Sequence, residues 1–329
     1  MKKIINNPAD YTDDMLRGIY KAHADQVKYV ADDLRCYCTT HKVPGKVAIV
    51  TGGGTGHLPL FLGYVGDGLL DGCGVGSVFQ SPSPEQIFEI SKEVNAGAGV
   101  LYLYGNYTGD IMTFDMAAEM CDMEDIPTKS IVGADDVLSG KPEVRRGIAG
   151  IWFMYKAAGA KAAEMGTLDE VLAAAQKAKD NTRTVGFALT PCILPEVGHS
   201  NFTLGDDEMA MGMGIHGEPG IWNGPIKPAK ELAEECLETI LKDMPVACGE
   251  EVSVLINGLG ATSLEEQYIL TNDVYEILGK KGIKIYRTYV GEYATSMEMA
   301  GASISLCKVD DELKHYLDYP VHTPFVCIR

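Results

Sequence analysis

Short apolar runs typical of buried β-strands alternate with helical patterns along the first half of the chain. Strands are predicted at 47–50, 100–104 and 130–132. The sequence Ser-Pro-Glu-Gln that begins at Ser83 combines an N-cap, a proline at the first helical position and a capping-box partner, so it predicts the start of a helix. Strands and helices that alternate in this way favour a mainly parallel sheet flanked by helices.

Helical patterns fill the segments between these strands and after them. They are predicted at 111–121 and at 145–165, and a further helix is predicted after Thr167, where Glu170 completes a second capping box. The first half of the chain is therefore expected to be an α/β domain.

The rhythm changes near residue 182. A strand predicted at 185–189 precedes about forty residues that are rich in Gly, Pro and Met, and a loop of that length is usually functional. Regular alternation then resumes, with a helix at 229–242, strands at 252–257, 284–290 and 303–308, and a helix capped by Ser263. Since 329 residues exceed the usual size of one core, we predict two α/β domains: 1–182, with the mainly parallel sheet, and 183–329, smaller and with a mixed sheet.

The charge of the chain excludes some partners. A net charge of −18 and a pI near 4.8 repel the phosphates of nucleic acids and anionic membrane surfaces. The polar start and the absence of any run of about eighteen apolar residues give no sign of a targeting or spanning segment. We therefore expect a cytoplasmic protein that binds neither nucleic acid nor membrane.

The nine cysteines predict neither a disulfide framework nor a metal site. Their number is odd, and most lie in apolar segments, as a reducing compartment allows. Cys36, Cys38 and His41 are the nearest approach to a ligand set, but no second pair follows at zinc spacing. No metal is expected.

Three glycine-rich loops, at 52–57, 106–110 and 211–220, follow or flank predicted strands. Ligands of open α/β sheets bind at the carboxyl ends of the strands. Each loop presents one titratable side chain: His57, Asp110 and His216. Two histidines and one carboxylate are a workable set for a nucleophile, a base and an orienting group.

Each loop also has a simpler interpretation. The first could bind phosphate, but its glycines miss the G-x-G-x-x-G spacing, because His57 or Pro59 stands at the third position; a Walker motif is also absent. Asp110 could be an ordinary helix N-cap. His216 could be a core histidine, although six of its neighbours between 211 and 220 are Gly, Pro or acidic, which is poor core composition.

Six motifs together resemble one family, in order and over almost the whole chain: GGGTGH, NYTGD, GMGIHGEPG, NGLGAT, LCKVDDE and PVHTP. They are similar to those of the substrate-binding subunit of dihydroxyacetone kinase. The resemblance implies that His216 binds the carbonyl of a short ketose as a hemiaminal. It implies that His57 and Asp110 act on the reacting hydroxyl. The substrate-binding positions that it implies are Gly54, Thr55, Gly56, His57, Gly105, Asp110 and His216.

Covalent capture suits a substrate of this size. A ketose of three or four carbons has about six to eight non-hydrogen atoms, and each contributes at most about 1.5 kcal/mol of binding. A bond that only a carbonyl can form would exclude polyols. Since a protonated imidazole has no free electron pair, adduct formation is expected to weaken below about pH 6.

The resemblance also implies partners. No cofactor is expected on this chain, and ATP or ADP with Mg²⁺ is expected on a separate nucleotide-binding L-type subunit or a fused helical domain. A phosphocarrier of the sugar phosphotransferase system is a possible phosphate source, and a homodimer is implied.

Two departures from the family pattern concern the substrate. Members selective for dihydroxyacetone carry a lysine where this chain has Gly105 and an acidic residue where it has Leu58. A longer ketose such as erythrulose is therefore as plausible as dihydroxyacetone. The family also includes paralogues that bind the sugar but act as co-activators of a transcription regulator, and this alternative stays open.

Overall fold

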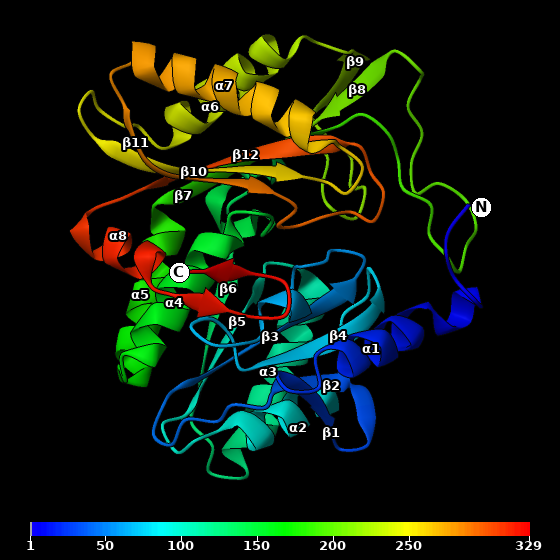
Figure 1. Cartoon of the computed structure of the whole chain (residues 1–329), viewed down its shortest axis with the longest axis vertical. Helices are drawn as coiled ribbons and strands as arrows, with labels where there is room; N and C mark the ends of the chain where they lie inside the picture. The colour runs from blue at the N-terminus through cyan, green and yellow to red at the C-terminus, as the bar shows by residue number, and fades with distance from the viewer. Residues whose placement is uncertain (1) are drawn as a thin grey trace.

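The computed structural model describes residues 2–329, which form two six-stranded sheets and the helices around them (Figure 1). The prediction of two α/β sheet systems, the first mainly parallel and the second mixed, is confirmed. Within the described residues, no helix is both long enough and apolar enough to cross a membrane.

The first sheet has the strand order β1-β2-β4-β3-β5-β6. Its strands are β1 (Val27–Val30), β2 (Asp33–Thr39), β3 (Ala48–Thr55), β4 (Gly72–Val78), β5 (Val100–Gly105) and β6 (Thr128–Gly133). Strand β3 pairs in parallel with β4 and β5, and β5 pairs in parallel with β6. The antiparallel β1 and β2 extend one edge and were not predicted.

Helices cover both faces of this sheet. They are α1 (Tyr11–Ala22), α2 (Pro84–Val94), α3 (Thr108–Asp122), α4 (Ile151–Ala163) and α5 (Leu168–Asp180). The alternation along β5 explains the arrangement: Tyr102 and Tyr104 pack with α2 and α3, whereas Leu101 and Leu103 pack with α4 and α5. Both faces are buried, as a parallel sheet requires.

The second sheet has the order β11-β10-β12-β7-β8-β9. Its strands are β7 (Thr182–Ala188), β8 (Glu208–Met211), β9 (Trp222–Pro225), β10 (Glu251–Gly258), β11 (Lys284–Gly291) and β12 (Gly301–Lys308). Strands β10 and β11 are parallel, and the other pairings are antiparallel. Helices α6 (Ala229–Asp243) and α7 (Leu264–Lys280) pack on its outer face.

Helices α4 and α5 lie between the two sheets (Figure 1). The core that contains them also includes Leu255 of β10 and Tyr289 of β11. The C-terminal segment then returns to the first half as α8 (Asp311–Asp318), β13 (Val321–His322) and β14 (Cys327–Ile328). There the backbones of Asp67 and His322 exchange two hydrogen bonds. Four short 3₁₀ turns complete the described secondary structure: Pro8–Asp10, Leu62–Tyr64, Val137–Ser139 and Pro142–Val144.

The predicted capping boxes at Ser83 and Thr167 are confirmed, and so is the predicted cap at Ser263, which proves to be a capping box with Glu266. The helix predicted at 145–165 was wrong at its start, because α4 begins only at Ile151. The preceding backbone is held instead by the carboxylate of Asp135, which accepts hydrogen bonds from the amides of Ile148 and Gly150.

Candidate functional site

Two of the predicted glycine loops meet across the two sheets. The first was predicted as a loop at 52–57, but β3 continues to Thr55 on the first sheet, and His57 lies just beyond its end. The third follows β8, on the second sheet, and carries His216. Their imidazole rings lie edge to face with centroids 4.7 Å apart. Phe79 lies beside both, stacked on His57 at 4.8 Å and edge-on to His216 at 5.2 Å. The ring of Tyr107, from the second loop, lies 4.9 Å from that of His216.

His57 is fully buried and held in one tautomer. Its Nδ1 lies 2.7 Å from the carbonyl oxygen of Thr295, so Nδ1 carries the proton and donates it. Its Nε2 is buried without a partner. Burial, and next the charge of His216, lower the pKa of His57 to about 3. His57 is therefore a neutral imidazole that offers an unshared electron pair.

Asp110 is the third residue of α3, and the N-cap of that helix is Tyr107. The N-cap interpretation of Asp110 was therefore wrong. Its carboxylate is buried, and Oδ1 has no hydrogen-bond partner. Burial raises the pKa of Asp110 to about 6, although a hydrogen bond from Ser81 and the charge of His216 act in the opposite direction.

His216 is partly exposed, with 24% of its side chain accessible. Its Nδ1 lies 2.9 Å from Oε1 of Glu218, and its backbone amide donates to Oε2 of the same carboxylate at 2.9 Å. Its carbonyl accepts from the side chain of Asn201. The core-histidine interpretation was wrong, because a carboxylate and not the core satisfies this ring. With Nδ1 donating to Glu218, Nε2 is the nitrogen with a free electron pair.

At the predicted substrate-binding positions 54–56, the backbone and not the side chain is what could contact a ligand. A Cβ on Gly54 would lie 2.6 Å from the backbone of Phe79 and Gln80, so only glycine fits there. The hydroxyl of Thr55 is already paired with that of Thr12 at 3.1 Å, and the carbonyl of Gly56 accepts the amide of Met297.

Gly105 ends β5 directly under the ring of Tyr107. A Cβ at position 105 would approach that ring to 2.9 Å. A side chain at position 105 would therefore require Tyr107, which contacts His216, to move.

Several residues of this cluster were not singled out in the sequence. Glu218 follows His216 by two positions, and this short spacing is a signal that was available. Phe79 and Thr295 carried no such signal, because they reach His57 only through the tertiary fold. Arg146, whose Nη1 lies 3.8 Å from Oε2 of Glu218, was placed in a helix, but it lies in the irregular segment before α4.

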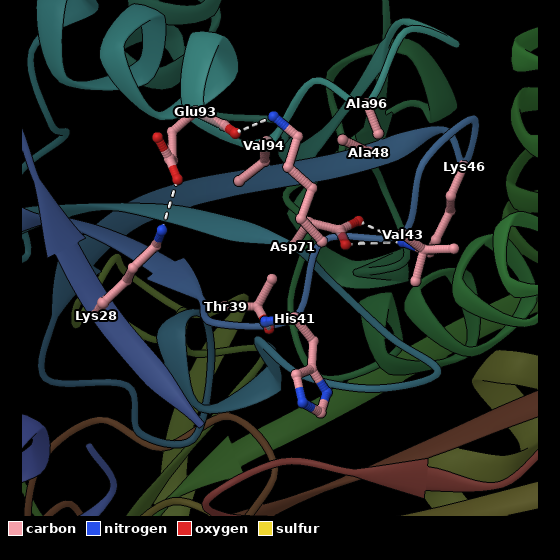
Figure 2. Close-up of a pocket in the computed structure, with 11 residues that line it drawn as sticks. Lys28, Thr39, His41, Val43, Lys46, Ala48, Asp71, Glu93, Val94 and Ala96 are labelled. Atoms are coloured by element: carbon pink, nitrogen blue, oxygen red, sulfur yellow. Dashed lines mark hydrogen bonds and ion pairs between the residues drawn. The ribbon is translucent and has the colours of Figure 1, made fainter. Parts of the chain in front are cut away.

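A depression on the first half carries a different set of charges. It contains about 20 Å³, little more than the space of one water molecule. Figure 2 shows that its charged groups pair with each other: Lys28 with Glu93, and Lys46 with Asp71. It lies at Ala48, where β3 begins, and therefore at the opposite end of the strand from His57. Because its lysines are already paired with carboxylates, this depression is a poorer candidate for a binding site than the cluster around His216.

No group of three or more metal-ligating side chains is arranged to hold an ion within residues 2–329. Cys36 and Cys38 are free thiols buried in β2. Burial raises the pKa of Cys36 to about 12, so it is a poor source of thiolate.

The fold and the site define an α/β protein in which loops of both sheets bring titratable side chains together. The family model described as Dak1 domain matches residues 17–325, and the chain belongs to the Dak1 domain family.

Two relatives show the range of named functions. The chain is 45% identical over 315 residues to the dihydroxyacetone-binding subunit DhaK of the PTS-dependent dihydroxyacetone kinase 1 of Listeria innocua, with 95% of each chain covered. It is 40% identical to the D-erythrulose kinase of Mycolicibacterium smegmatis, where the match covers 98% of this chain and 56% of that protein.

Two solved structures share the fold. The dihydroxyacetone kinase of C. freundii superposes with a TM-score of 0.92 at 27% identity, over 99% of this chain and 60% of that one. The dihydroxyacetone kinase operon co-activator DhaQ superposes with a TM-score of 0.87 at 31% identity, over 94% and 96%.

Proposed function

We propose that this chain is the ketose-binding subunit of a kinase of the dihydroxyacetone kinase type. It holds a short ketose as a hemiaminal on His216 and presents the terminal hydroxyl of the sugar for phosphorylation. The observation that carries this proposal is the pair of buried, unpartnered acceptors, Nε2 of His57 and Oδ1 of Asp110, beside an imidazole whose Nδ1 is engaged. Buried polar atoms without partners point to a ligand that satisfies them.

Capture of the sugar begins at His216. Nε2 bonds to the carbonyl carbon, and the π electron pair moves to the oxygen, which takes up one proton from the solvent. The ring keeps its Nδ1 proton and becomes positively charged, and the Glu218 carboxylate balances that charge. Burial alone would raise the pKa of Glu218, but the hydrogen bond from His216 and the charges of His216 and Arg146 outweigh it and hold the pKa at about 2. Glu218 is therefore ionised whenever the adduct forms.

Asp110 and His57 then act on the hydroxyl that receives phosphate. Asp110 accepts the proton of the hydroxyl, and it is ionised for this role above about pH 6. Before transfer, the hydroxyl donates its one hydrogen bond to Nε2 of His57, which orients it and stays neutral because burial lowers its pKa. The same proton then passes to Asp110 as the hydroxyl oxygen bonds to phosphorus.

The phosphoryl group comes from a partner. ATP or ADP with Mg²⁺ is proposed on a nucleotide-binding L-type subunit, and a phosphocarrier of the sugar phosphotransferase system is proposed to renew it. The names of relatives support this, since the Listeria innocua protein is called PTS-dependent and a binding subunit.

Further proposals concern the protein as a whole. A homodimer and a cytoplasmic location are proposed from the family resemblance alone. A division into domains 1–182 and 183–329 follows the two sheets, although α8, β13 and β14 of the second part pack on the first. Light scattering that gave a monomeric mass would contradict the dimer.

The preferred ketose is either dihydroxyacetone or a longer sugar such as erythrulose. Gly105 leaves the position beside Tyr107 without a side chain, and relatives with both names are similar to this chain. Intact mass spectrometry after incubation with each short ketose tests binding. A coupled assay with the purified L-type subunit and ATP tests transfer.

The alternative is a ketose-binding co-activator, as the name of the DhaQ structure suggests for that protein. It needs His216 but has no use for the acceptors on His57 and Asp110. An adduct without turnover on any ketose, with an active partner present, would favour the co-activator. The absence of an adduct with every ketose would refute both functions.

A further inference from the structure

We infer that Arg146 is a positioning residue that acts through Glu218 to hold His216 in the orientation for carbonyl attack. This inference rests on the proposed function, because it concerns how the same imidazole is aimed. The structure shows a continuous chain of contacts from the end of the first sheet to the nucleophile. Its members are Asp136, Arg146, Glu218 and His216.

The carboxylate of Glu218 fixes its own loop. It accepts both the ring Nδ1–H and the backbone N–H of His216, each at 2.9 Å. The first contact selects the tautomer, and the second selects the backbone geometry. Glu218 is 30% exposed, however, and a partly solvated glutamate can adopt several rotamers, so another group must fix its orientation.

Arg146 meets this need from the other half of the molecule. Its Nη2 donates to the carbonyl of Gly212 at 2.9 Å, and its Nη1 lies 3.8 Å from Oε2 of Glu218. One guanidinium therefore contacts both sides of His216 along the loop. Only 13% of its side chain is exposed, so water competes little for these contacts.

Asp136 anchors the guanidinium in turn. Its Oδ2 accepts Nε of Arg146 at 3.0 Å, and the side chain is only 1% exposed. The backbone amide of Asp136 also donates to the carbonyl of Arg146 at 3.1 Å. A buried carboxylate that pairs with one arginine through side chain and backbone leaves that arginine little freedom.

Gly214 supplies an independent sign that the loop is built around this pair. A Cβ there would lie 2.0 Å from Oε2 of Glu218 and 2.4 Å from Nη1 of Arg146. Any side chain at position 214 would push the two charges apart. The absence of a side chain in the middle of the loop is what lets the arginine approach the glutamate.

The geometry requires an arginine. A guanidinium has five N–H donors in a rigid plane and can serve Asp136, Gly212 and Glu218 together. A lysine presents one compact charge and cannot keep all three contacts. Arg146→Lys therefore preserves the charge and removes the positioning.

The experiment measures adduct formation with dihydroxyacetone and erythrulose by intact mass spectrometry, over a series of ketose concentrations and from pH 5 to 9. We compare the full-length wild type with Arg146→Lys, Glu218→Gln and the double variant. Arg17→Lys is the matched control, because Arg17 pairs with Asp14 on the exposed face of α1, away from the site. Thermal unfolding is followed for each.

We expect Arg146→Lys and Glu218→Gln each to raise the ketose concentration for half occupancy by about tenfold or more. The double variant should be no worse than the worse single variant, because the arginine acts through the glutamate. Glu218→Gln should also change the pH dependence of adduct formation, since the ring then faces His57, Tyr107 and Asp110 without its carboxylate. Arg17→Lys should match the wild type.

The outcomes distinguish a failure of the proposed function from a failure of the positioning role of Arg146. A wild type without any adduct would refute the proposed function. A wild type that forms the adduct, with Arg146→Lys equal to it at every pH, would refute the role of Arg146 alone, and so would fully additive effects in the double variant. If the Arg146→Lys variant does not fold, Asp136→Asn is tested in its place, because this substitution weakens the anchor of the Arg146 guanidinium. A half-occupancy concentration equal to that of the wild type would then refute the inference.

Discussion

The ring of His57 meets that of His216 edge-on, with centroids 4.7 Å apart, although each comes from a different sheet. Both rings are held through Nδ1, His57 by the carbonyl of Thr295 and His216 by the carboxylate of Glu218. Each therefore leaves Nε2 free. The two nitrogens differ in access, because His57 is fully buried and His216 is partly exposed. This difference suits one for orienting a bound group and the other for capturing an incoming one.

His216→Ala is expected to abolish the ketose adduct, because no other neutral nucleophile takes its place beside Glu218. The unfolding temperature should change little, since the side chain is partly exposed and contributes little apolar burial. Intact mass spectrometry and thermal unfolding measure the two effects. Retention of the adduct would place the nucleophile elsewhere.

Asp110→Asn is expected to keep the adduct and to lower phosphoryl transfer about 100-fold or more, as the loss of a general base does. In the wild type, transfer should rise as the pH passes through about 6, where Asp110 ionises. The coupled assay with the L-type subunit checks both statements. Equal turnover in the Asn variant would show that Asp110 has no part in proton transfer.

The same substitution is expected to stabilise the free protein. The pKa of Asp110 is raised from 3.8 to about 6, so the folded state binds the proton more tightly than the unfolded state does. Wild-type stability is therefore lost as the pH rises from about 4 to about 6, by roughly 1–3 kcal/mol. Denaturant unfolding should show Asp110→Asn more stable than the wild type at pH 7 and equal to it near pH 4. A constant difference at both pH values would contradict the raised pKa.

His57 is expected to stay neutral, with its proton on Nδ1, down to about pH 4, because burial lowers its pKa to about 3. Nitrogen-15 NMR of the labelled imidazoles distinguishes the two neutral tautomers and the cation. The exposed His41, with 70% of its side chain accessible, serves as the internal reference for a solvated ring. Protonation of His57 near pH 6 would contradict its placement.

Gly54→Ala is expected to destabilise the protein by about 1–3 kcal/mol, because the new methyl group would overlap the backbone of Phe79 and Gln80. Since Phe79 stacks on His57, transfer should also fall. Gly279→Ala, in helix α7, is the control: no atom lies within 4 Å of the added methyl group, so its effect should stay within about 1 kcal/mol. Equal stability of the two variants would contradict the close approach at Gly54.

The sequence predicted the regular part of the fold well and the irregular strands poorly. Buried runs such as 100–104 and capped helices carry local signals that tertiary structure did not override. Strand β4 was not predicted, because three of its seven residues are glycine and it shows neither apolar alternation nor a residue preference for strand. Strands β8 and β9, four residues each, lie inside the glycine-rich stretch and take their form from pairing with β7.

The site divides in the same way. His57, Asp110 and His216 were recognisable because each lies in a glycine loop near a strand. Thr295 and Arg146 could not be recognised in the sequence. Thr295 contributes its backbone carbonyl to His57, and Arg146 contributes its guanidinium to Glu218, and both contacts form only when the chain folds. No pattern in one sequence records such a contact.

The hydrogen bond from His57 to Thr295 joins the first sheet to a loop of the second. A small rotation of one sheet against the other would break it and release the ring to exchange its proton between the two nitrogens. Nε2 would then become a donor, and a hydroxyl that had donated a hydrogen bond to it would have to turn and accept one instead. The tautomer of His57 therefore depends on the relative position of the two sheets.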